Sequence, residues 1–339
     1  MSAPPLAGRT ALVTGGTGGI GRETALGLAK LGATVFVAGR DRARGEAAVQ
    51  AIRERSGNGA VELLAADLSS LDQVRWLAER FGTMHPRLDI LVNNAAGLFP
   101  ERRVTVDGHE ATLAMAHLSP ALLTHLLLPR LRASVPARIV NVASGAHRGA
   151  RIRWDDLRSE RGYRALDVYA RAKLLNLTWT FELARRLRGT GITVVAAEPG
   201  SAWTAMTESM TPQMLPAALR LAWPLLRRRL RGRGPEAAAR SSLVAATSRE
   251  LVSGAYLDPR GEPAGASRAS RDGEAALRAW ETTAELLGVP LERFGATRVA
   301  RRPAAVKHAP PRGRAARSGW AGSVYREASP AAAEEVAAA

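Results

Sequence analysis

Two residues four positions apart, Tyr169 and Lys173, have the types and the spacing of a proton donor and its activator. Residues 166–187 predict one long helix, so the two side chains share one of its faces. A free tyrosine has a pKa of about 10, and a lysine cation nearby lowers that pKa because it favours the phenolate. Ser144 follows a predicted strand at residues 138–142 that ends at the same edge. The alternative is a chance tyrosine–lysine pair on a solvated helix.

A glycine-rich turn lies near the N-terminus, between a predicted strand at residues 10–14 and a helical pattern that begins at residue 22. A strand, a glycine turn and a helix form the context that a dinucleotide fingerprint requires. Gly15, Gly19 and Gly21 let the backbone turn sharply and come close to a pyrophosphate, and the helix N-terminus offers unpaired N–H groups to it. The alternative is an ordinary tight turn.

The end of the second predicted strand, residues 34–38, carries a basic residue where NAD sites carry an acid. An acidic side chain there binds the ribose hydroxyls of NAD, whereas an arginine accommodates the 2′-phosphate of NADP. Here Gly39 is followed by Arg40, and Arg22 in the glycine turn adds a second cation. The sequence therefore favours NADP(H); two solvated surface arginines are the alternative.

Two further strand ends bring polar groups to the same crevice. Residues 65–68 close a third strand, where Asp67 is expected to accept a hydrogen bond from the adenine amine, and residues 89–97 form a fourth strand that runs into a loop with Asn93. Ligands of open α/β sheets bind at the carboxyl ends of the strands. The sequence therefore predicts a Rossmann-like, doubly wound parallel sheet with helices on both faces, and an enzyme of hydride transfer.

These motifs resemble those of the short-chain dehydrogenase/reductase superfamily over residues 8–290, and some stretches look closest to its retinol-dehydrogenase-like and WW-domain-oxidoreductase-like members. The matching motifs occur in the family's order: the glycine turn, Asn93 to Gly97, Asn141 to Ser144, Tyr169 with Lys173, and Pro199 and Gly200 followed by Thr204.

The resemblance implies a role for each matched residue. Tyr169 would be the general acid/base, Lys173 would bind the nicotinamide ribose and depress the tyrosine pKa, and Ser144 would hold the substrate oxygen. Tyr169 and Lys173 would also contact the cofactor. The other residues that would line the cofactor site are Gly15, Thr17, Gly19, Ile20, Gly21, Arg22, Arg40, Asp67, Leu68, Asn93, Ala95, Gly97, Pro199, Gly200 and Thr204.

One position departs from the family's pattern. Family members usually carry an asparagine in the helix after the fourth strand, where it anchors a water that relays protons to the lysine. Ala116 stands at that place and cannot hold this water. His117 is adjacent, but neighbouring helical residues point about 100° apart, so it does not replace the asparagine automatically. We therefore expect slower turnover, or another water path to Tyr169.

Composition is typical of a soluble globular protein. The chain has 339 residues and a hydrophobic fraction of 46%, enough to bury a full core. It has no cysteine, which excludes disulfides and thiolate metal sites, and its histidines lack metal-ligand spacing. The first eight residues lack an apolar stretch, and no run of about 18 apolar residues occurs. We therefore expect no leader, no membrane span and a cytoplasmic location.

The formal net charge of +17 does not indicate a nucleic-acid-binding protein. Only three of the 48 basic residues are lysines, a skew towards arginine that is typical of a GC-rich genome. No interleaved basic and aromatic motif occurs before the C-terminal segment, so no nucleic-acid partner is expected. Residues 296–339 are basic and lack apolar periodicity, which predicts a disordered tail.

Residues 1–295 predict one domain, whose αβ rhythm is interrupted by an insertion at residues 201–233. Met206, Met210 and other apolar residues in this insertion suggest a lid over a bulky lipophilic substrate, or a flap packed on its own core. Its basic and apolar second half could instead lie on a membrane surface. Pro224 breaks the helical pattern there, and no stable membrane insertion is expected.

Together these features predict an NADP(H)-dependent enzyme that reduces a ketone or aldehyde of a lipophilic small molecule, or oxidises the alcohol. A bacterial secondary-metabolite ketone is one substrate class that fits, and a homodimer or homotetramer is one assembly that fits. Two alternatives remain open. One is a cofactor-binding regulatory or interaction protein with little turnover, and the other is a non-redox lyase or epimerase on the same scaffold.

Overall fold

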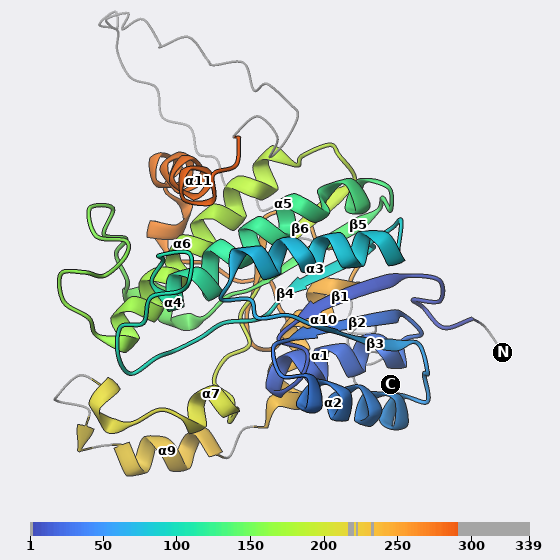
Figure 1. Cartoon of the computed structure of the whole chain (residues 1–339), viewed down its shortest axis with the longest axis horizontal. Helices are drawn as coiled ribbons and strands as arrows, with labels where there is room; N and C mark the ends of the chain where they lie inside the picture. Colours follow the sequence, from blue (N-terminus) through green and yellow to red (C-terminus); the bar gives the residue numbers. More distant parts are fainter. Residues whose placement is uncertain (1–2, 216–219, 222, 232–233, 291–339) are drawn as a thin grey trace, which may run out of the picture. The chain divides into compact units, whose positions relative to one another are not determined.

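Among the described residues, apolar runs form seven strands that pair side by side in parallel. The strands are β1 (Thr10–Thr14), β2 (Thr34–Gly39), β3 (Val61–Ala65), β4 (Ile90–Asn93), β5 (Ala137–Val142), β6 (Ile192–Ala197) and β7 (Ala255–Leu257). Their order in the sheet is β3-β2-β1-β4-β5-β6-β7 (Figure 1). The chain therefore reverses its direction of winding between β1 and β4, and in open α/β sheets this switch point is where ligands bind.

The computed structural model describes residues 3–290 except 216–219, 222 and 232–233. The predicted tail, residues 296–339, lies outside the described residues. The longer helices are α1 (Gly19–Lys30), α2 (Arg42–Ser56), α3 (Leu71–Met84), α5 (Ser119–Arg132), α6 (Ala165–Arg186), α10 (Pro235–Thr247) and α11 (Gly273–Leu287).

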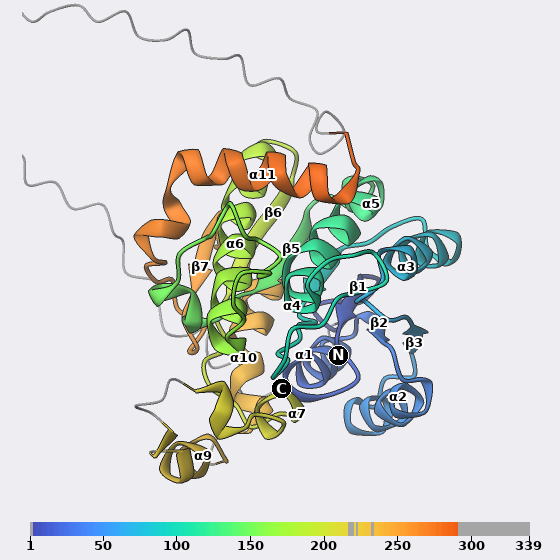
Figure 2. The same ribbon diagram turned by 60° about the vertical axis from the view of Figure 1, so that its left-hand side comes forward.

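Helices cover both faces of the sheet (Figure 2). Helices α1, α2 and α10 pack on one face, α3, α5 and α6 pack on the other, and α11 lies against α6. Alternate strand residues point to the two helical layers. Leu12 and Phe36 pack in the layer that contains α3, whereas Val13 and Val35 pack in the layer that contains α1. A strand buried on both faces has no polar face, which explains its nearly continuous apolar sequence. The predicted doubly wound fold is confirmed.

Element boundaries follow the sequence pattern closely where the apolar period is strong. The predicted long helix at residues 166–187 is α6, and the predicted strand at 10–14 is β1. Helix α1 begins at Gly19, three residues before the predicted start. The reason is that its first turn is built from the glycine-rich segment, which lacks the apolar period used to recognise helices.

Residues Ala111–Arg132 form the one helical stretch, among residues that the structure describes, that is long and apolar enough to cross a membrane. It comprises α4 (Ala111–Leu113), a π-helical turn η1 (Ala114–Leu118) and α5. Its most apolar window is 83% buried inside the fold. Packing against the sheet accounts for the apolar composition of this stretch.

His117, in η1, is completely buried. Its Nε2 lies 2.7 Å from the Oγ1 of Thr283 on α11, and Thr283 donates its own proton to the carbonyl oxygen of Ala279. His117 therefore donates from Nε2 as a neutral imidazole. Burial lowers the pKa of His117 to about 3.

Stability should therefore depend on pH through His117. The unfolded histidine takes up a proton below a pKa of about 6.5, whereas the folded one stays neutral, so its contribution is complete above that pH and is lost as the pH falls towards 3. At about 1.36 kcal/mol per pH unit, unfolding at pH 5 should cost about 2 kcal/mol less than at pH 7.

Urea unfolding at pH 7 and pH 5 measures this difference in the wild type and in His117→Gln, which keeps a donor for Thr283. We expect the difference between pH 7 and pH 5 to be about 2 kcal/mol smaller in the variant, while His147, whose pKa burial also lowers, keeps its own contribution. The same pH dependence in both proteins would contradict the role given to His117.

Candidate active site

Ser144, Tyr169 and Lys173 come together at the carboxyl end of β5. Ser144 lies two residues past this strand, and the other two residues lie on α6. The Nζ atom of Lys173 donates to the carbonyl oxygen of Val142, the last residue of β5, at 2.7 Å. The same nitrogen lies 6.0 Å from the ring centroid of Tyr169. Tyr169 and Lys173 are four residues apart and share one face of α6. The bond from Lys173 to β5 therefore also keeps Tyr169 near the strand that leads to Ser144.

Burial changes the protonation equilibria of this group. It lowers the pKa of Lys173 to about 8. Burial also raises the pKa of Tyr169, and a hydrogen bond with Ser144 offsets part of this rise. Burial is the largest cause, so the pKa of Tyr169 lies above its usual value, and a lowering of that pKa by Lys173 stays a prediction. At neutral pH, Tyr169 carries a proton that it can donate and Lys173 is mostly charged.

The glycine turn brings the start of α1 close to the end of β1. Gly15 has a φ of +64°, and a Cβ placed on Gly21 would stand 2.3 Å from the carbonyl oxygen of Gly15. Asn94 supports the turn: its Nδ2 donates to the carbonyl oxygens of Thr14 and Gly15 at 2.9 and 3.4 Å, and its N–H donates to the Thr14 hydroxyl. Asn94 was not among the predicted site residues, although the Asn-Asn motif pointed to its loop.

The side chain of Asn93 does not face the cofactor crevice, contrary to the prediction. Its Nδ2 donates to Thr124 Oγ1 at 3.0 Å and to Asn141 Oδ1 at 2.8 Å, and Asn141 donates in turn to Thr180 Oγ1 at 2.8 Å. This buried chain joins β4, β5, α5 and α6. Strand alternation turns Asn93 to the same face as Leu91, inside the α3 layer.

The N-terminus of α1 fits a phosphate group. Its N-cap is Gly18, no side chain caps the helix, and no acidic residue lies in its first turn. The Nη2 atom of Arg44 lies 3.8 Å from the position that a Cβ on Gly18 would take. Uncapped N–H groups at a helix N-terminus bind pyrophosphate, and a guanidinium beside them adds positive charge. These residues therefore fit a dinucleotide.

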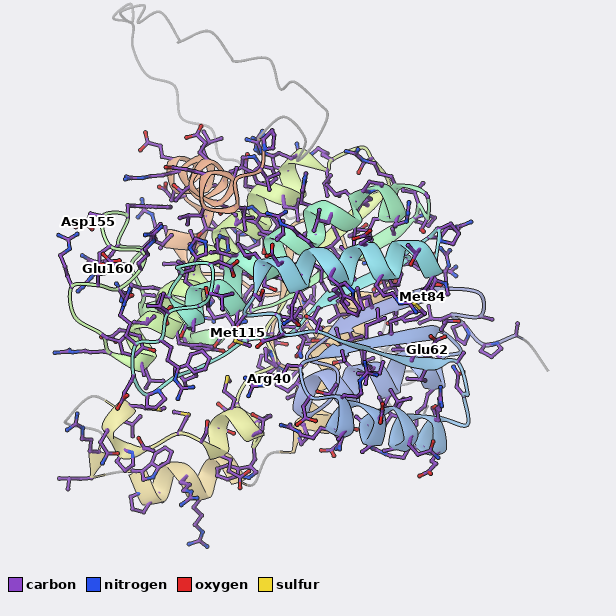
Figure 3. All side chains as sticks on the ribbon, viewed as in Figure 1. Arg40, Glu62, Met84, Met115, Asp155 and Glu160 are labelled. Atoms are coloured by element: carbon purple, nitrogen blue, oxygen red, sulfur yellow. The ribbon has the colours of Figure 1, made fainter. Side chains whose placement is uncertain are left out.

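The arginines near the end of β2 differ from the predicted pair. Arg22 pairs with Glu23 at 3.0 Å, and Arg55 on α2 binds the same carboxylate at 2.9 Å. Burial alone would raise the pKa of Glu23, but Arg55 and Arg22 hold it below its usual value. Arg55 thus joins α2 to α1 through Glu23, and Arg44 lies beside the glycine turn. The contact of Arg22 with a 2′-phosphate stays a prediction. Arg40 is exposed where β2 ends (Figure 3).

Two contacts place other predicted residues at this edge. The Cγ2 of Thr204 would lie 3.1 Å from a Cβ on Gly19, and the Oγ1 of Thr17 would lie 2.7 Å from a Cβ on Gly39. The start of the insertion therefore touches the glycine turn. The remaining predicted residues follow the ends of neighbouring strands: Ile20 after β1, Ala95 and Gly97 after β4, and Pro199 and Gly200 after β6.

Asp67 and Leu68, the predicted cofactor residues after β3, make contacts within the protein. Asp67 Oδ1 accepts hydrogen bonds from the Ser69 N–H at 2.9 Å and from the Ser69 hydroxyl at 2.8 Å. The side chain of Leu68 is 5% exposed and packs in the core beside α3. Asp67 therefore shapes this loop, and its proposed contact with the adenine amine stays a prediction.

The insertion places methionines next to the tyrosine. It contains α7 (Ala205–Glu208), the short turn η3 (Pro212–Met214) and α9 (Trp223–Arg231). Met206, Met210 and Met214 form one apolar cluster with Tyr169 and Leu98. The predicted lid thus contributes flexible thioether side chains beside the candidate proton donor.

Three further residues near the site are buried. Ala116 is buried in η1, and His117 turns towards α11, so His117 does not take the place of the expected asparagine. His147 is buried too: its Nδ1 donates to the carbonyl oxygen of Ser144 at 2.7 Å, and its Nε2 accepts from the N–H of Ser267 at 3.2 Å. Burial lowers the pKa of His147, so it holds the Ser144 backbone as a neutral ring.

Comparison with known proteins supplies the family. Residues 9–215 match the family model of the short chain dehydrogenases. The chain is 42% identical over 300 residues to dehydrogenase/reductase SDR family member 13 from Bos taurus, a match covering 85% of this chain and 77% of the relative. It is 38% identical over 287 residues to retinol dehydrogenase 12 from Mus musculus, covering 84% and 88%.

Solved structures give the same result. An uncharacterised protein from Mycobacterium paratuberculosis superposes with a TM-score of 0.68 at 32% identity, over 86% of this chain and 97% of that one. RhlG from Pseudomonas aeruginosa, solved with NADP in its active site, superposes with a TM-score of 0.58 at 33% identity, over 77% and 98%.

The parallel sheet, the glycine turn and the Ser-Tyr-Lys group define an oxidoreductase that uses a nicotinamide cofactor. The chain belongs to the short-chain dehydrogenase/reductase family, in its retinol-dehydrogenase-like branch. The resemblance seen in the sequence is thereby confirmed.

The two adjacent asparagines should respond differently to substitution. Asn94→Ala removes two hydrogen bonds that hold the glycine turn, so the Kd for NADPH should rise about tenfold, the equivalent of one such bond. Asn93→Ala leaves buried partners unsatisfied and should lower the Tm without weakening NADPH binding by the folded protein. Fluorescence titration and thermal unfolding measure the two effects, and equal NADPH affinity in both variants would contradict this assignment.

Proposed function

We propose that this protein reduces a ketone or aldehyde of a lipophilic small molecule with NADPH, or oxidises the corresponding alcohol with NADP⁺. The observation that supports this most is the grouping of Ser144, Tyr169 and Lys173 at one strand end, with the Lys173 ammonium bonded to Val142. The uncapped start of α1 adds a phosphate site at the same edge of the sheet.

The residues have complementary roles in this reaction. A nicotinamide held at this crevice would supply the hydride for the carbonyl carbon, and Ser144 holds the carbonyl oxygen. Tyr169 donates its phenolic proton to that oxygen as negative charge develops on it. The Lys173 cation stabilises the phenolate that remains, because opposite charges attract strongly where water is excluded. In the oxidation, Tyr169 as phenolate takes the proton of the alcohol.

The arginines at the end of β2 favour NADP over NAD. Arg40 is exposed there, and Arg44 lies beside the glycine turn. The acidic residue that follows Arg40 is Asp41, whose carboxylate accepts the N–H of Arg44 at 3.0 Å as the cap of α2. It is therefore engaged in the helix cap. The NADP in the RhlG structure is consistent with this choice.

The substrate class follows from the apolar cluster around Tyr169. Methionines of the lid adapt their shape to bulky apolar groups. The curated relatives include retinol dehydrogenase 12, named for a lipophilic alcohol. We therefore propose retinoid-like aldehydes and polycyclic ketones, the class that includes secondary-metabolite intermediates, as substrates to test first.

Replacement of the proton donor tests the proposed reaction. We expect NADPH-dependent turnover of at least one compound in a panel of retinal, aromatic ketones and polycyclic ketones. Tyr169→Phe should lower kcat by a factor of about 10² or more, the usual scale of general acid catalysis, while NADPH still binds. The decrease in NADPH absorbance measures the rate, and an active Tyr169→Phe enzyme would overturn the mechanism.

Replacement of the arginines tests the cofactor preference. Arg40→Ser and Arg44→Ser each remove a charged partner of the 2′-phosphate, a bond worth about 1.5–3 kcal/mol, so the KM for NADPH should rise at least about tenfold. The KM for NADH should stay unchanged in Arg40→Ser, whereas Arg44→Ser should raise it too, because Arg44 lies beside the N–H groups that fit the pyrophosphate. Arg42→Ser is the matched control, because Arg42 lies between them but pairs with Glu46 at 3.7 Å. Equal effects of all three variants would contradict a specific phosphate site.

The two alternative functions predict different results. NADPH binding without turnover on any compound would favour a regulatory or interaction protein, and restoring an asparagine with Ala116→Asn would then distinguish a slow enzyme from an inactive one. A product of unchanged mass would favour a lyase or epimerase, because a reductase adds two hydrogens.

A further inference from the structure

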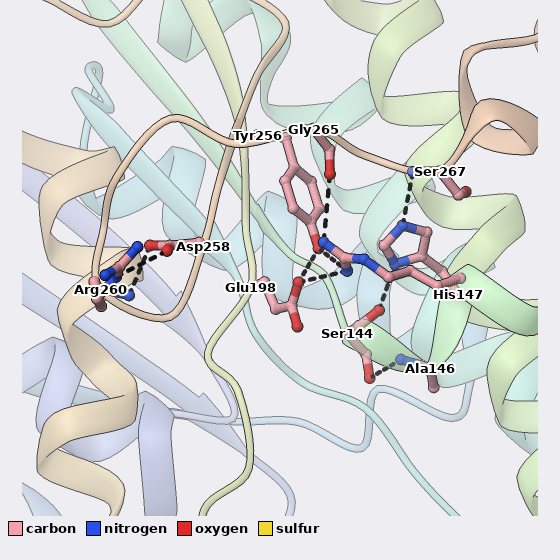
Figure 4. A network of polar contacts seen from close by, with 10 residues as sticks. Ser144, Ala146, His147, Glu198, Tyr256, Asp258, Arg260, Gly265 and Ser267 are labelled. Carbon is pink, nitrogen blue, oxygen red and sulfur yellow. Dashed lines mark hydrogen bonds and ion pairs between the residues drawn. The ribbon is translucent and has the colours of Figure 1, made fainter.

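A cluster of three side chains lies near Ser144, where three separate segments of the chain meet (Figure 4). It consists of Arg148 in the turn η2 (Gly145–Gly149), Glu198 after β6 and Tyr256 in β7. One carboxylate oxygen, Oε2 of Glu198, accepts hydrogen bonds from the hydroxyl of Tyr256 and from Nη1 of Arg148, the latter at 2.9 Å. We call these three residues the Glu198 cluster.

The arginine is held from several sides. Its Nη2 donates to the carbonyl oxygen of Gly265 at 3.3 Å, its Nη1 donates to the hydroxyl of Tyr256 at 3.2 Å, and its guanidinium carbon lies 5.5 Å from the centre of the Tyr256 ring. The carboxylate of Glu198 is 12% exposed. The side chain of Arg148 is 46% exposed, so its bonds to Glu198, Tyr256 and Gly265, rather than burial, restrict its geometry.

The Glu198 cluster is adjacent in sequence to both halves of the proposed active site. Arg148 follows Ser144 by four residues, and Glu198 directly precedes Pro199 and Gly200. The other carboxylate oxygen, Oε1, would lie only 2.6 Å from a Cβ on Gly145, the residue after Ser144. The carboxylate therefore lies against the backbone of the Ser144 turn.

The buried His147 gives η2 a second attachment. It receives the N–H of Ser267 and donates to the carbonyl oxygen of Ser144. The segment after β7 thus holds η2 at two points, through Gly265 to Arg148 and through Ser267 to His147. The backbone N–H of Ala143 already bonds to the carbonyl oxygen of Ala197 at 2.8 Å. The Glu198 carboxylate adds a side-chain connection from this arrangement to the end of β6.

We propose that Glu198 is a positioning residue of the enzyme: by binding Arg148 and Tyr256 through one oxygen, it sets the place of Ser144 relative to Pro199 and Gly200. This inference rests on the proposed function, in which Ser144 holds the substrate oxygen beside the nicotinamide. Displacement of a reacting group by about 1 Å costs about 10² in rate, so a group that holds this distance affects turnover without touching the substrate.

The variant Glu198→Gln keeps the shape of the side chain and removes its charge. We expect kcat to fall about tenfold, because the bonds to Arg148 and Tyr256 weaken and Ser144 shifts, while the Kd for NADPH stays unchanged. The matched control is Glu182→Gln on α6. Glu182 is also a buried carboxylate bound by two arginines, Arg185 and Arg186, at 2.6 and 2.7 Å, and this variant should leave kcat unchanged.

Combination with Ser144→Ala separates positioning from a general loss of stability. If Glu198 acts through Ser144, then Glu198→Gln causes less than about a twofold further loss of kcat in the Ser144→Ala background. A purely structural role would lower kcat by the same factor in both backgrounds, and that result would overturn the proposal.

Hydrogen exchange provides a readout that needs no turnover. In the wild type with NADPH, the amides of residues 145–149 should exchange slowly. Glu198→Gln should accelerate them at least about tenfold, the effect of losing about 1.4 kcal/mol of protection, and Glu182→Gln should not. Unchanged exchange in Glu198→Gln would overturn the positioning role. Accelerated exchange with an inactive wild type would show instead that the proposed function fails while the cluster still holds the turn.

Discussion

The hydrogen bond from the Lys173 ammonium to the carbonyl oxygen of Val142 is the interaction on which the rest of the site depends. A buried ammonium needs an acceptor, because an unpaired charge in the interior is very costly. Only the end of β5 supplies this acceptor in the described structure. The bond therefore ties one turn of α6 to the end of β5 and helps to hold Tyr169 near Ser144.

The same burial that fixes this geometry also sets the proton chemistry. It keeps the proton on Tyr169 and brings the pKa of Lys173 to about 8. Separate buried polar groups hold the surrounding strand ends: the Asn93 chain joins β4 to β5, and Asn94 joins the β4 loop to the glycine turn. The catalytic and cofactor residues thus remain at the crevice because neighbouring side chains make the contacts that hold the strand ends in place.

Neighbouring side chains decide which partners the predicted site residues have. Arg22 pairs with Glu23, which also binds Arg55, and Arg44 reaches the glycine turn from α2. The pattern of charges along the chain does not reveal such competition between partners. Likewise, the effect of Lys173 on the tyrosine depends on how much water surrounds the phenolate, which only packing determines.

By itself, the sequence determined what repeats locally: the apolar strand runs, the long helix with Tyr169 and Lys173 on one face, and the glycine turn. These features follow from backbone geometry and residue spacing, which act over a few neighbouring positions. The tertiary structure alone decided which of the two asparagines supports the turn, and it alone brought Arg148, Glu198 and Tyr256 to one place. Those outcomes depend on contacts between segments as far as 108 residues apart, which no local pattern encodes.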